Sequence, residues 1–356
     1  MKRFYIAAAL SCIGLAAMAQ TTLQQIAQNT ELGGYFVGQG KITDQEDADV
    51  KSNFDTRYVR LYLDGKVSDF QYKLQFQLNG SYDDKKGNAP RALDIWAEWQ
   101  KYDYVRVRAG QFKRGITFEN PMNPWDYGAG GGAQIVSKLA GGSDRVGEHT
   151  CNGRDLGVQV QGDLFPVGTA QRKLLHYQLG IYNGQGINHS DANSKKDYIG
   201  GLILRPFKGM QLGAFGWYGD FVKNGITVDR RRVAFGAKYD GDFCVRTEYM
   251  HSKGRKVGAD AEGNACVVGA DCADGWYTMI GKPIGEHLRL YVKYDVYRDT
   301  GHWDSTKSIY NLTADYYFTK NLKIQLNLQR THDRLLNASG QDGDYNSADL
   351  QLYLRF

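Results

Sequence analysis

The sequence predicts an all-β protein: a transmembrane antiparallel β-barrel of about sixteen strands, with short periplasmic turns and long extracellular loops. Three features of the chain indicate this fold. Segments in which apolar and polar residues alternate recur along the chain, and the connections between them are alternately short and long. Aromatic residues and glycine are abundant, with 24 Tyr, 15 Phe and 43 Gly against 6 Pro, a composition that suits strands and turns.

The N-terminal residues are typical of an exported protein. Lys2 and Arg3 precede an apolar stretch, and small residues around Ala19 allow cleavage, so residues 1–19 are predicted to be a signal peptide. Residues 20–29 are expected to form a short periplasmic lead. The formal net charge of +5 becomes +3 without Lys2 and Arg3, which is too mild a bias for a nucleic-acid binder. Together with the barrel, these features predict the outer membrane of a Gram-negative bacterium.

The barrel itself is expected over residues 30–356. A strand in such a barrel turns one face to lipid and the other to a polar lumen, which gives the sequence a period of two. In residues 70–79, for example, Phe, Tyr and Leu alternate with Gln, Lys and Asn. About sixteen segments follow this pattern. They start near Gly33, Asp55, Asp69, Ala92, Tyr104, Gly153, Lys173, Asp197, Met210, Arg230, Phe243, Trp276, His287, Ile309, Leu322 and Ala348.

The connections support the same architecture. Every second connection is short, as at residues 67–68 and 240–242, and the others are long and polar, as at 41–53 and 183–196. Short turns at one rim and long loops at the other are typical of outer-membrane barrels. The last segment ends at Phe356, and such a terminal aromatic residue resembles the signal that bacterial barrel-assembly machinery recognises. That machinery and outer-membrane lipid are therefore expected partners.

If the apolar row of each strand faces lipid, the polar row lines the lumen and carries a surplus of basic residues. Positive charges along a water-filled pore raise the local concentration of anions. The alternative is that these side chains only solvate the inner face and pair across strands with acidic neighbours such as Asp94, Glu98 and Asp315. The candidate anion contacts are Arg60, Lys73, Arg106, Arg108, Arg232, Lys238, Arg246, Arg289, Lys293 and Lys323.

A short segment resembles a known family. Residues 107–113 read Val-Arg-Ala-Gly-Gln-Phe-Lys, and residues 118–121 read Phe-Glu-Asn-Pro. This pattern resembles the segment that marks the phosphate-selective porin O and P family, although Gly-Ile replaces the family's Pro-Phe pair at residues 115–116. The resemblance implies an outer-membrane porin, a homotrimer, through which small anions such as phosphate or other oxyanions diffuse passively.

The longest loop, residues 112–152, is long enough to be either functional or disordered. The resemblance implies that it folds inward and narrows the channel, and the alternative is a loop packed over the mouth. Its candidate constriction residues are Lys113, Arg114, Glu119, Asp126, Lys138 and Arg145.

The sequence indicates no catalytic residue, no cofactor and no metal site. Residues 141–145 lack the final Gly of a nucleophile elbow, and the seven His have no metal-ligand spacing. Two other functions remain open. A general or saccharide-selective porin would use Trp96, Tyr291 and Tyr297 as sugar contacts, and a barrel hydrolase would use Ser and His on adjacent strands.

Four cysteines follow the predicted signal peptide: Cys151, Cys244, Cys266 and Cys272. An exported protein meets an oxidising compartment, so disulfides are allowed. The short spacing of Cys266 and Cys272 suits a disulfide within a loop. Four cysteines allow three pairings, however, and the sequence does not choose among them.

Overall fold

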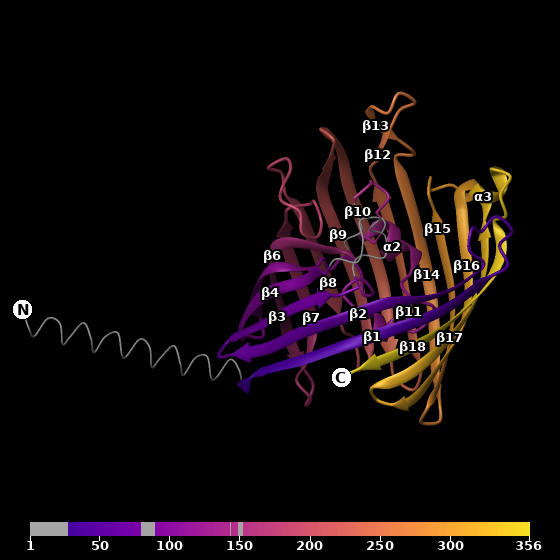
Figure 1. Cartoon of the computed structure of the whole chain (residues 1–356). Coiled ribbons are helices and arrows are strands. Elements are labelled where there is room, and N and C mark those ends of the chain that lie inside the picture. Colours follow the sequence, from indigo (N-terminus) through magenta and orange to yellow (C-terminus); the bar gives the residue numbers. More distant parts are fainter. Residues whose placement is uncertain (1–27, 80–89, 143, 149–151) are drawn as a thin grey trace, which may run out of the picture.

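The computed structural model describes residues 28–79, 90–142, 144–148 and 152–356. The predicted signal peptide and all but the last two residues of the predicted lead lie outside these ranges. Within them, the strands close into one antiparallel barrel (Figure 1). The barrel strands are β1 (Thr30–Thr43), β2 (Ser52–Val67), β3 (Phe70–Gln77), β4 (Arg91–Tyr102), β5 (Val105–Lys113), β6 (Arg154–Val167), β7 (Arg172–Tyr182), β8 (Asp197–Leu204), β9 (Met210–Lys223), β10 (Ile226–Asp240), β11 (Cys244–Lys253), β14 (Cys272–Ile284), β15 (Leu288–Arg298), β16 (Thr306–Thr319), β17 (Leu322–Asp333) and β18 (Asp344–Arg355).

The first and last strands close the barrel. Phe36 of β1 pairs with Leu354 of β18 on one side and with Val59 of β2 on the other. Every other strand pairs with its neighbours in chain order once the small hairpin between β11 and β14 is set aside. The predicted fold class is therefore confirmed, and each predicted segment corresponds to one barrel strand.

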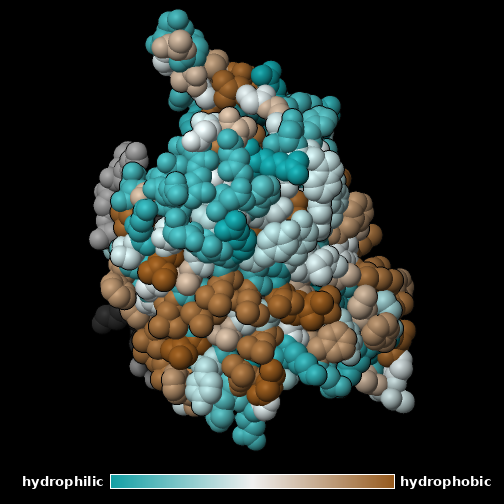
Figure 2. Space-filling view, turned by 90° about the vertical axis from the view of Figure 1, so that its right-hand side faces the viewer, coloured by the Kyte–Doolittle hydropathy of each residue, from teal (hydrophilic) through white to brown (hydrophobic). Residues whose placement is uncertain are grey.

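The distribution of polarity is inverted relative to that of a water-soluble protein. On β17, Leu326 and Leu328 are 42% and 45% exposed, whereas Gln325 and Asn327 between them are buried. Leu350, on the adjacent β18, is likewise exposed. On the face drawn in Figure 2, apolar residues form a band across the lower part of the barrel, below a hydrophilic upper end. An apolar outer band around a polar interior is what a membrane-spanning barrel requires.

The connections follow the predicted alternation with one exception. Between β9 and β10, on the rim of the long loops, only Asn224 and Gly225 separate the strands. Both have positive φ, 51° and 79°, as a two-residue type I′ hairpin turn requires. The sequence analysis missed this Asn-Gly turn and started the tenth segment at Arg230, whereas β10 starts at Ile226.

The loops contain further short elements. A hairpin of β12 (Lys256–Ala259) and β13 (Ala265–Val268), which was not predicted, projects beyond the rim (Figure 1). The long loop carries a 3-10 turn, η1 (Pro124–Asp126), and a short helix, α2 (Gln134–Leu139). Two other loops carry η2 (Trp303–Ser305) and α3 (Arg334–Ala338). No helix in the described ranges is long and apolar enough to cross a membrane.

The cysteines do not form the disulfide that the sequence suggested. Cys266 lies in β13 and Cys272 starts β14, and both are free thiols, as is Cys244. Cys151 lies outside the described residues. The short spacing of Cys266 and Cys272 was misleading because β13 is paired to β12 rather than to the start of β14.

Candidate functional site: a basic passage beside the long loop

The described part of the long loop lies against inward-facing side chains of the barrel wall. Its backbone amides donate hydrogen bonds to these side chains, from Gly130 to Asn327 Oδ1 at 2.9 Å and from Gln134 to Asp295 Oδ2 at 3.0 Å. In the other direction, Lys323 Nζ donates to the carbonyl oxygen of Trp125 at 3.0 Å. A loop away from water needs such partners, because buried backbone polar groups are costly when unpaired.

Apolar contacts hold the loop against the barrel wall. Ile116, Ile135 and Leu139 are fully buried and belong to the same hydrophobic cluster as Trp217 of β9 and Tyr277 of β14. The aromatic rings of Phe118 and Phe215 meet edge to face, with centroids 5.6 Å apart. This part of the loop therefore packs on the wall that contains β9 and β14, whereas Trp125 of η1 reaches β1 and β18, where it packs with Tyr35 and Tyr353.

The residues that carry the family resemblance hold this loop in position. Gly110 has φ +125°, and a Cβ there would lie 2.2 Å from the carbonyl oxygen of Ile95. Gln111 Nε2 donates to the carbonyl oxygen of Leu93 at 2.7 Å. Lys113 Nζ donates to the carbonyl oxygen of Met122 at 2.6 Å and so ties the strand end to the loop.

Glu119 is the last matching residue of that motif, and it is fully buried. Its carboxylate accepts a hydrogen bond from the amide of Ala133 and forms an ion pair with Arg246 at 2.9 Å. Arg246 also donates to the carbonyl oxygen of Tyr127 at 2.6 Å. Two predicted residues, one on the loop and one on β11, are thus brought together, and their contact fixes the loop to the wall.

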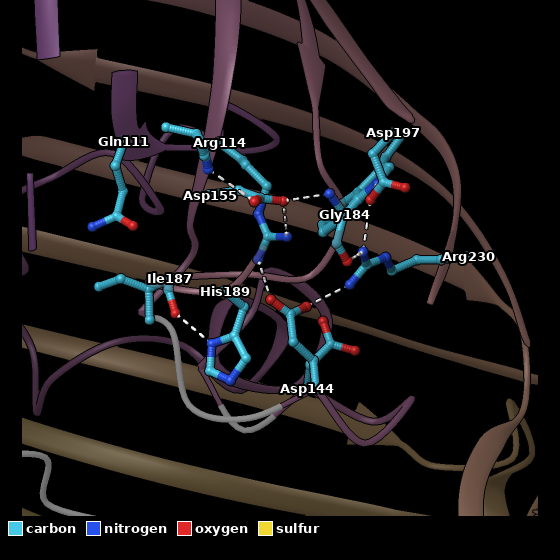
Figure 3. Close-up of polar contacts among 12 residues, drawn as sticks. Gln111, Arg114, Asp144, Asp155, Gly184, Ile187, His189, Asp197 and Arg230 are labelled. Atoms are coloured by element: carbon cyan, nitrogen blue, oxygen red, sulfur yellow. Dashed lines mark hydrogen bonds and ion pairs between the residues drawn. The ribbon is translucent and has the colours of Figure 1, made fainter. Parts of the chain in front are cut away.

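A buried ionic network fixes the end of the loop (Figure 3). Arg114 contacts Glu148 at 3.0 Å and Asp155 at 3.5 Å. Glu148 also pairs with Arg230, which contacts Asp197 at 2.6 Å. All of these side chains are almost completely buried. Breaking one member of such a network is costly because it leaves a buried charge unpaired.

A second buried ion pair, between Asp144 and Arg232, joins the loop to β10. Both Nη atoms of Arg232 donate to the two carboxylate oxygens of Asp144, each at 2.6 Å. Burial by itself raises the pKa of Asp144, but the charge and hydrogen bonds of Arg232 hold that pKa below its usual range. Arg145 donates to the carbonyl oxygens of Gly254 and Ala270 and so ties the loop to the segments around the β12–β13 hairpin.

Beside the loop lies a cavity of about 240 Å³, called the basic passage below. Five basic side chains and one carboxylate line it. They come from β2 to β6, and a short stretch of the loop closes the other side. The lining residues are Tyr35, Arg60, Lys73, Gln75, Asp94, Trp96, Arg108, Phe112, Lys113, Pro121, Met122, Asn123, Pro124 and Arg154.

Four predicted candidates meet in the basic passage, and their partners differ. Lys73 pairs with Asp64 at 2.7 Å and Arg108 pairs with Glu98 at 2.8 Å. Arg60 donates instead to neutral groups, to Gln77 Oε1 at 3.0 Å and to the hydroxyl of Tyr35 at 2.6 Å. Within the described residues, Arg60 and Lys113 form no ion pair with a carboxylate.

The remaining predicted residues do not line the passage. On the wall, Arg106 pairs with Asp163 at 2.7 Å, Lys238 with Asp240 at 2.9 Å, Lys293 with Asp295 at 3.8 Å and Lys323 with Asp315 at 2.8 Å, and Arg289 lies over the ring of Tyr317. On the loop, Asp126 and Lys138 are exposed. Pairing with a carboxylate, the alternative weighed for the lumen residues, therefore describes most of these residues. Arg106 and Lys323 pair across strands, whereas Lys238 and Lys293 pair with a residue of their own strand.

Two basic residues were missed by the sequence analysis. Arg154 lies two residues before the lipid-facing Leu156, so strict alternation would point its side chain outward as well. At the first position of β6, however, the side chain turns inward and binds Asp94 through Nε at 2.9 Å and Nη2 at 2.7 Å. Arg57 sits at an irregularity in the pairing of β1 and β2, and its Nη1 donates to the buried Gln351 at 3.0 Å. Such β-bulges redirect a side chain, and alternation alone cannot reveal them.

The structure describes no group of three or more His, Cys, Asp or Glu that could hold a metal ion within its ranges. Of the histidines, His176 on β7 pairs with Asp163 at 3.0 Å. Tyr291 and Tyr297, the candidate sugar contacts, are buried in the cluster under the loop, and only Trp96 of that set lines the passage.

The fold and the inward-lying loop define the class of the protein: a sixteen-stranded barrel of the outer-membrane porin type. Residues 33–121 match the model of the family described as phosphate-selective porin O and P, which confirms the resemblance seen in residues 107–121. The match spans β1 to the start of the loop. A search of curated proteins finds no match.

Solved structures extend the similarity of fold over the whole barrel. The anion-selective porin from Comamonas acidovorans superposes with a TM-score of 0.66 at 14% identity, over 92% of this chain and 99% of that one. OmpF of Salmonella typhi, in complex with daunomycin, gives 0.64 at 14% identity, over 92% and 98%. The outer membrane channel DcaP of Acinetobacter baumannii gives 0.62 at 11% identity, over 92% and 97%.

Proposed function

We propose that this protein is an outer-membrane porin through which small anions, phosphate and other oxyanions among them, diffuse passively. The observation that carries the proposal is the charge of the basic passage: five basic side chains and one carboxylate, Asp94, line it, and Arg60 and Lys113 form no ion pair among the described residues. Positive charges beside a narrow aqueous path lower the barrier for anions, provided that each contact is weak enough to release the ion. The porin from Comamonas acidovorans, which has a similar fold, is anion-selective, and this supports the proposed preference for anions.

The path of the long loop supports a constriction at this point. Pro121 to Pro124 form one wall of the passage, and Lys113 binds the loop through Met122. We propose that this stretch sets the narrowest part of the channel, with Lys113 at its edge. In this proposal Arg114, Glu119 and Arg145 act as anchors of the loop, whereas Asp126 and Lys138 lie on the loop outside the passage.

The lumen residues outside the passage contribute less to anion preference in this proposal. Arg106, Lys238, Lys293 and Lys323 each face a carboxylate within 4 Å. A paired cation presents little net field to an ion in the channel. Arg60 and Lys113, which lack such a partner in the described part of the chain, are therefore expected to dominate the selectivity.

The test is the reversal potential of the purified protein in a planar bilayer under a potassium chloride gradient. In water, a unit charge about 4 Å from an ion contributes about 1 kcal/mol before screening, so Arg60→Gln with Lys113→Gln should lower the preference for chloride roughly tenfold. A matched control is Arg231→Gln with Lys320→Gln, because both residues are exposed and neither lines the passage. A wild-type potential near zero, or equal effects of the two double variants, contradicts the proposal.

The two rival functions make different predictions. A saccharide-selective porin needs a track of accessible aromatic rings, but the loop covers Tyr291 and Tyr297. A general porin would show little charge selectivity in the same bilayer experiment. The family match and the fold favour a channel over an enzyme. A barrel hydrolase would lose activity on one Ser or His substitution while its conductance stayed unchanged.

We further propose that the barrels assemble as a homotrimer within outer-membrane lipid. One structural neighbour, OmpT of Vibrio cholerae, is described in a trimer form, and it superposes with a TM-score of 0.60. Cross-linking in the membrane, followed by mass measurement, tests this assembly. A single-barrel mass at every cross-linker concentration would contradict it.

A further inference from the structure

The basic passage is not only basic, because a large part of its wall is apolar. Besides the charged residues, the lining contains Tyr35, Trp96, Phe112, Met122 and two prolines. Sites for small organic ligands join apolar walls to a few well-placed polar groups, and this lining offers both kinds of surface. An inorganic ion, which is hydrated on every side, gains nothing from such a wall. This composition therefore favours a solute that carries an apolar body as well as a charge.

The charges of the passage favour a solute of low charge. Three of the five cations already face a carboxylate: Lys73 faces Asp64, Arg108 faces Glu98, and Arg154 holds Asp94 with two nitrogens. Only Arg60 and Lys113 remain without one among the described residues. A carboxylate can be shared between two such cations. Inorganic phosphate, which carries between one and two charges at neutral pH, meets stronger repulsion from Asp94 than a monocarboxylate does.

One donor in the wall lacks an acceptor. Nη1 of Arg154 is buried and has no hydrogen-bond partner among the described residues, and the Arg154 side chain is only 2% exposed. Buried polar groups are nearly always paired, so an orphaned guanidinium nitrogen marks a place where an acceptor fits. Nη1 is covered by its neighbours here. A carboxylate held first by Arg60 and Lys113 would reach it after a small shift of those neighbours.

The wall also offers a flat surface. The guanidinium carbon of Arg108 lies 4.2 Å from the centre of the Trp96 ring, so the two planar groups lie one over the other. Planar rings pack well against aromatic and guanidinium planes. Pro121 and Pro124 stiffen the opposing stretch of the loop, because each fixes its own backbone φ.

Resting on the anion passage proposed above, we propose that this passage is a binding site for small organic carboxylates with a flat apolar body, in preference to inorganic phosphate. The carboxylate is held by Arg60, Lys113 and the free nitrogen of Arg154. The apolar body lies against Trp96 and the proline-bearing stretch of the loop. Because the site lies on the path of the ions, an occupant reduces the ionic current while it is bound.

The experiment titrates sodium benzoate, sodium acetate, sodium phosphate and uncharged benzyl alcohol against the potassium chloride current of single channels. Benzoate is expected to block half of the current at a concentration about tenfold below that of acetate or phosphate, because its ring buries more apolar surface. Benzyl alcohol is expected to have no effect at those concentrations. A block by phosphate as strong as that by benzoate, or equal blocks by benzoate and acetate, overturns the inference.

Two variants localise the block. Arg154→Lys keeps the charge but loses the forked guanidinium, and it should raise the half-blocking concentration of benzoate about tenfold, the loss expected for one charge-assisted contact. Trp96→Leu should raise the half-blocking concentration of benzoate toward that of acetate and leave that of phosphate unchanged. This variant tests the site even if Arg154→Lys fails to assemble. Arg231→Lys, on the outer face of β10, is the matched control, and a shift in this control as large as that in Arg154→Lys counts against the site.

The reversal potential distinguishes a failure of the carboxylate site from a failure of the proposed anion passage. If the wild-type current favours chloride but benzoate does not block it preferentially, the carboxylate site is refuted and the anion passage stands. If the reversal potential is near zero, the proposed function itself fails.

Discussion

The replacement Gly110→Ala tests how the family-like segment shapes the passage. Gly110 has φ +125°, and an added Cβ would lie 2.2 Å from the carbonyl oxygen of Ile95 and 2.7 Å from Cα of Trp96. Both atoms belong to the backbone of β4, so no side-chain rotation relieves the overlap. Strand β4 must separate from β5, and it carries Trp96 and Asp94 of the passage with it.

The expected cost can be worked from two contributions. A backbone conformation that side chains avoid costs about 1–3 kcal/mol. Separating the strands leaves at least one backbone group between β4 and β5 without a partner, which adds about 1–3 kcal/mol when that group is buried. The free energy of unfolding should therefore fall by about 2–6 kcal/mol, a large fraction of the stability of an ordinary domain.

The assay is urea-induced unfolding of the protein refolded in lipid vesicles, followed by tryptophan fluorescence. Gly216→Ala is the matched control, because it makes the same substitution in another barrel strand where a Cβ meets nothing within 4 Å. The control should stay within about 0.5 kcal/mol of wild type. If Gly110→Ala is as stable as Gly216→Ala and its chloride selectivity is unchanged, the reasoning from the close backbone contact is refuted.

Three further predictions concern the ion pair of Asp144 with Arg232 and the thiols. Asp144→Asn removes the carboxylate partner of the buried Arg232 and should destabilise the docked loop by about 3–5 kcal/mol. The barrel should still form, but the noise of the open-channel current should rise. Unchanged noise in single-channel records contradicts this prediction. Because the pKa of Asp144 is lowered in the folded protein, its ion pair stabilises the docked loop fully above about pH 3.9, and this stabilisation is lost as the pH falls below that value. The current noise of the wild-type channel should therefore stay constant from pH 7 to about pH 4.5 and rise only in stronger acid. Cys266 and Cys272 should be alkylated without prior reduction, as counted by mass spectrometry, and a mass gain that appears only after reduction would disprove the free thiols.

The sequence alone determined the barrel because its signal is local. The alternation of lipid-facing and lumen-facing residues is contained within each strand, as in Leu326 and Leu328 on either side of Asn327. The lengths of the connections then show which rim of the barrel carries the short turns. The same local rule located Arg60, Lys73 and Arg108 on the inner face. It failed at Asn224–Gly225, where a two-residue turn interrupts the regular order of the loops.

Only the tertiary structure decided which of the inner residues form a site. The partner of Arg154 is Asp94, sixty positions away in the sequence, and the bond exists because the barrel brings β4, β5 and β6 together. The loop then packs against several strands of the inner wall and leaves Arg60 and Lys113 beside the passage. Whether a basic residue is neutralised or faces the channel depends on these distant contacts, since the period of two fixes the side of the sheet and not the neighbour across it.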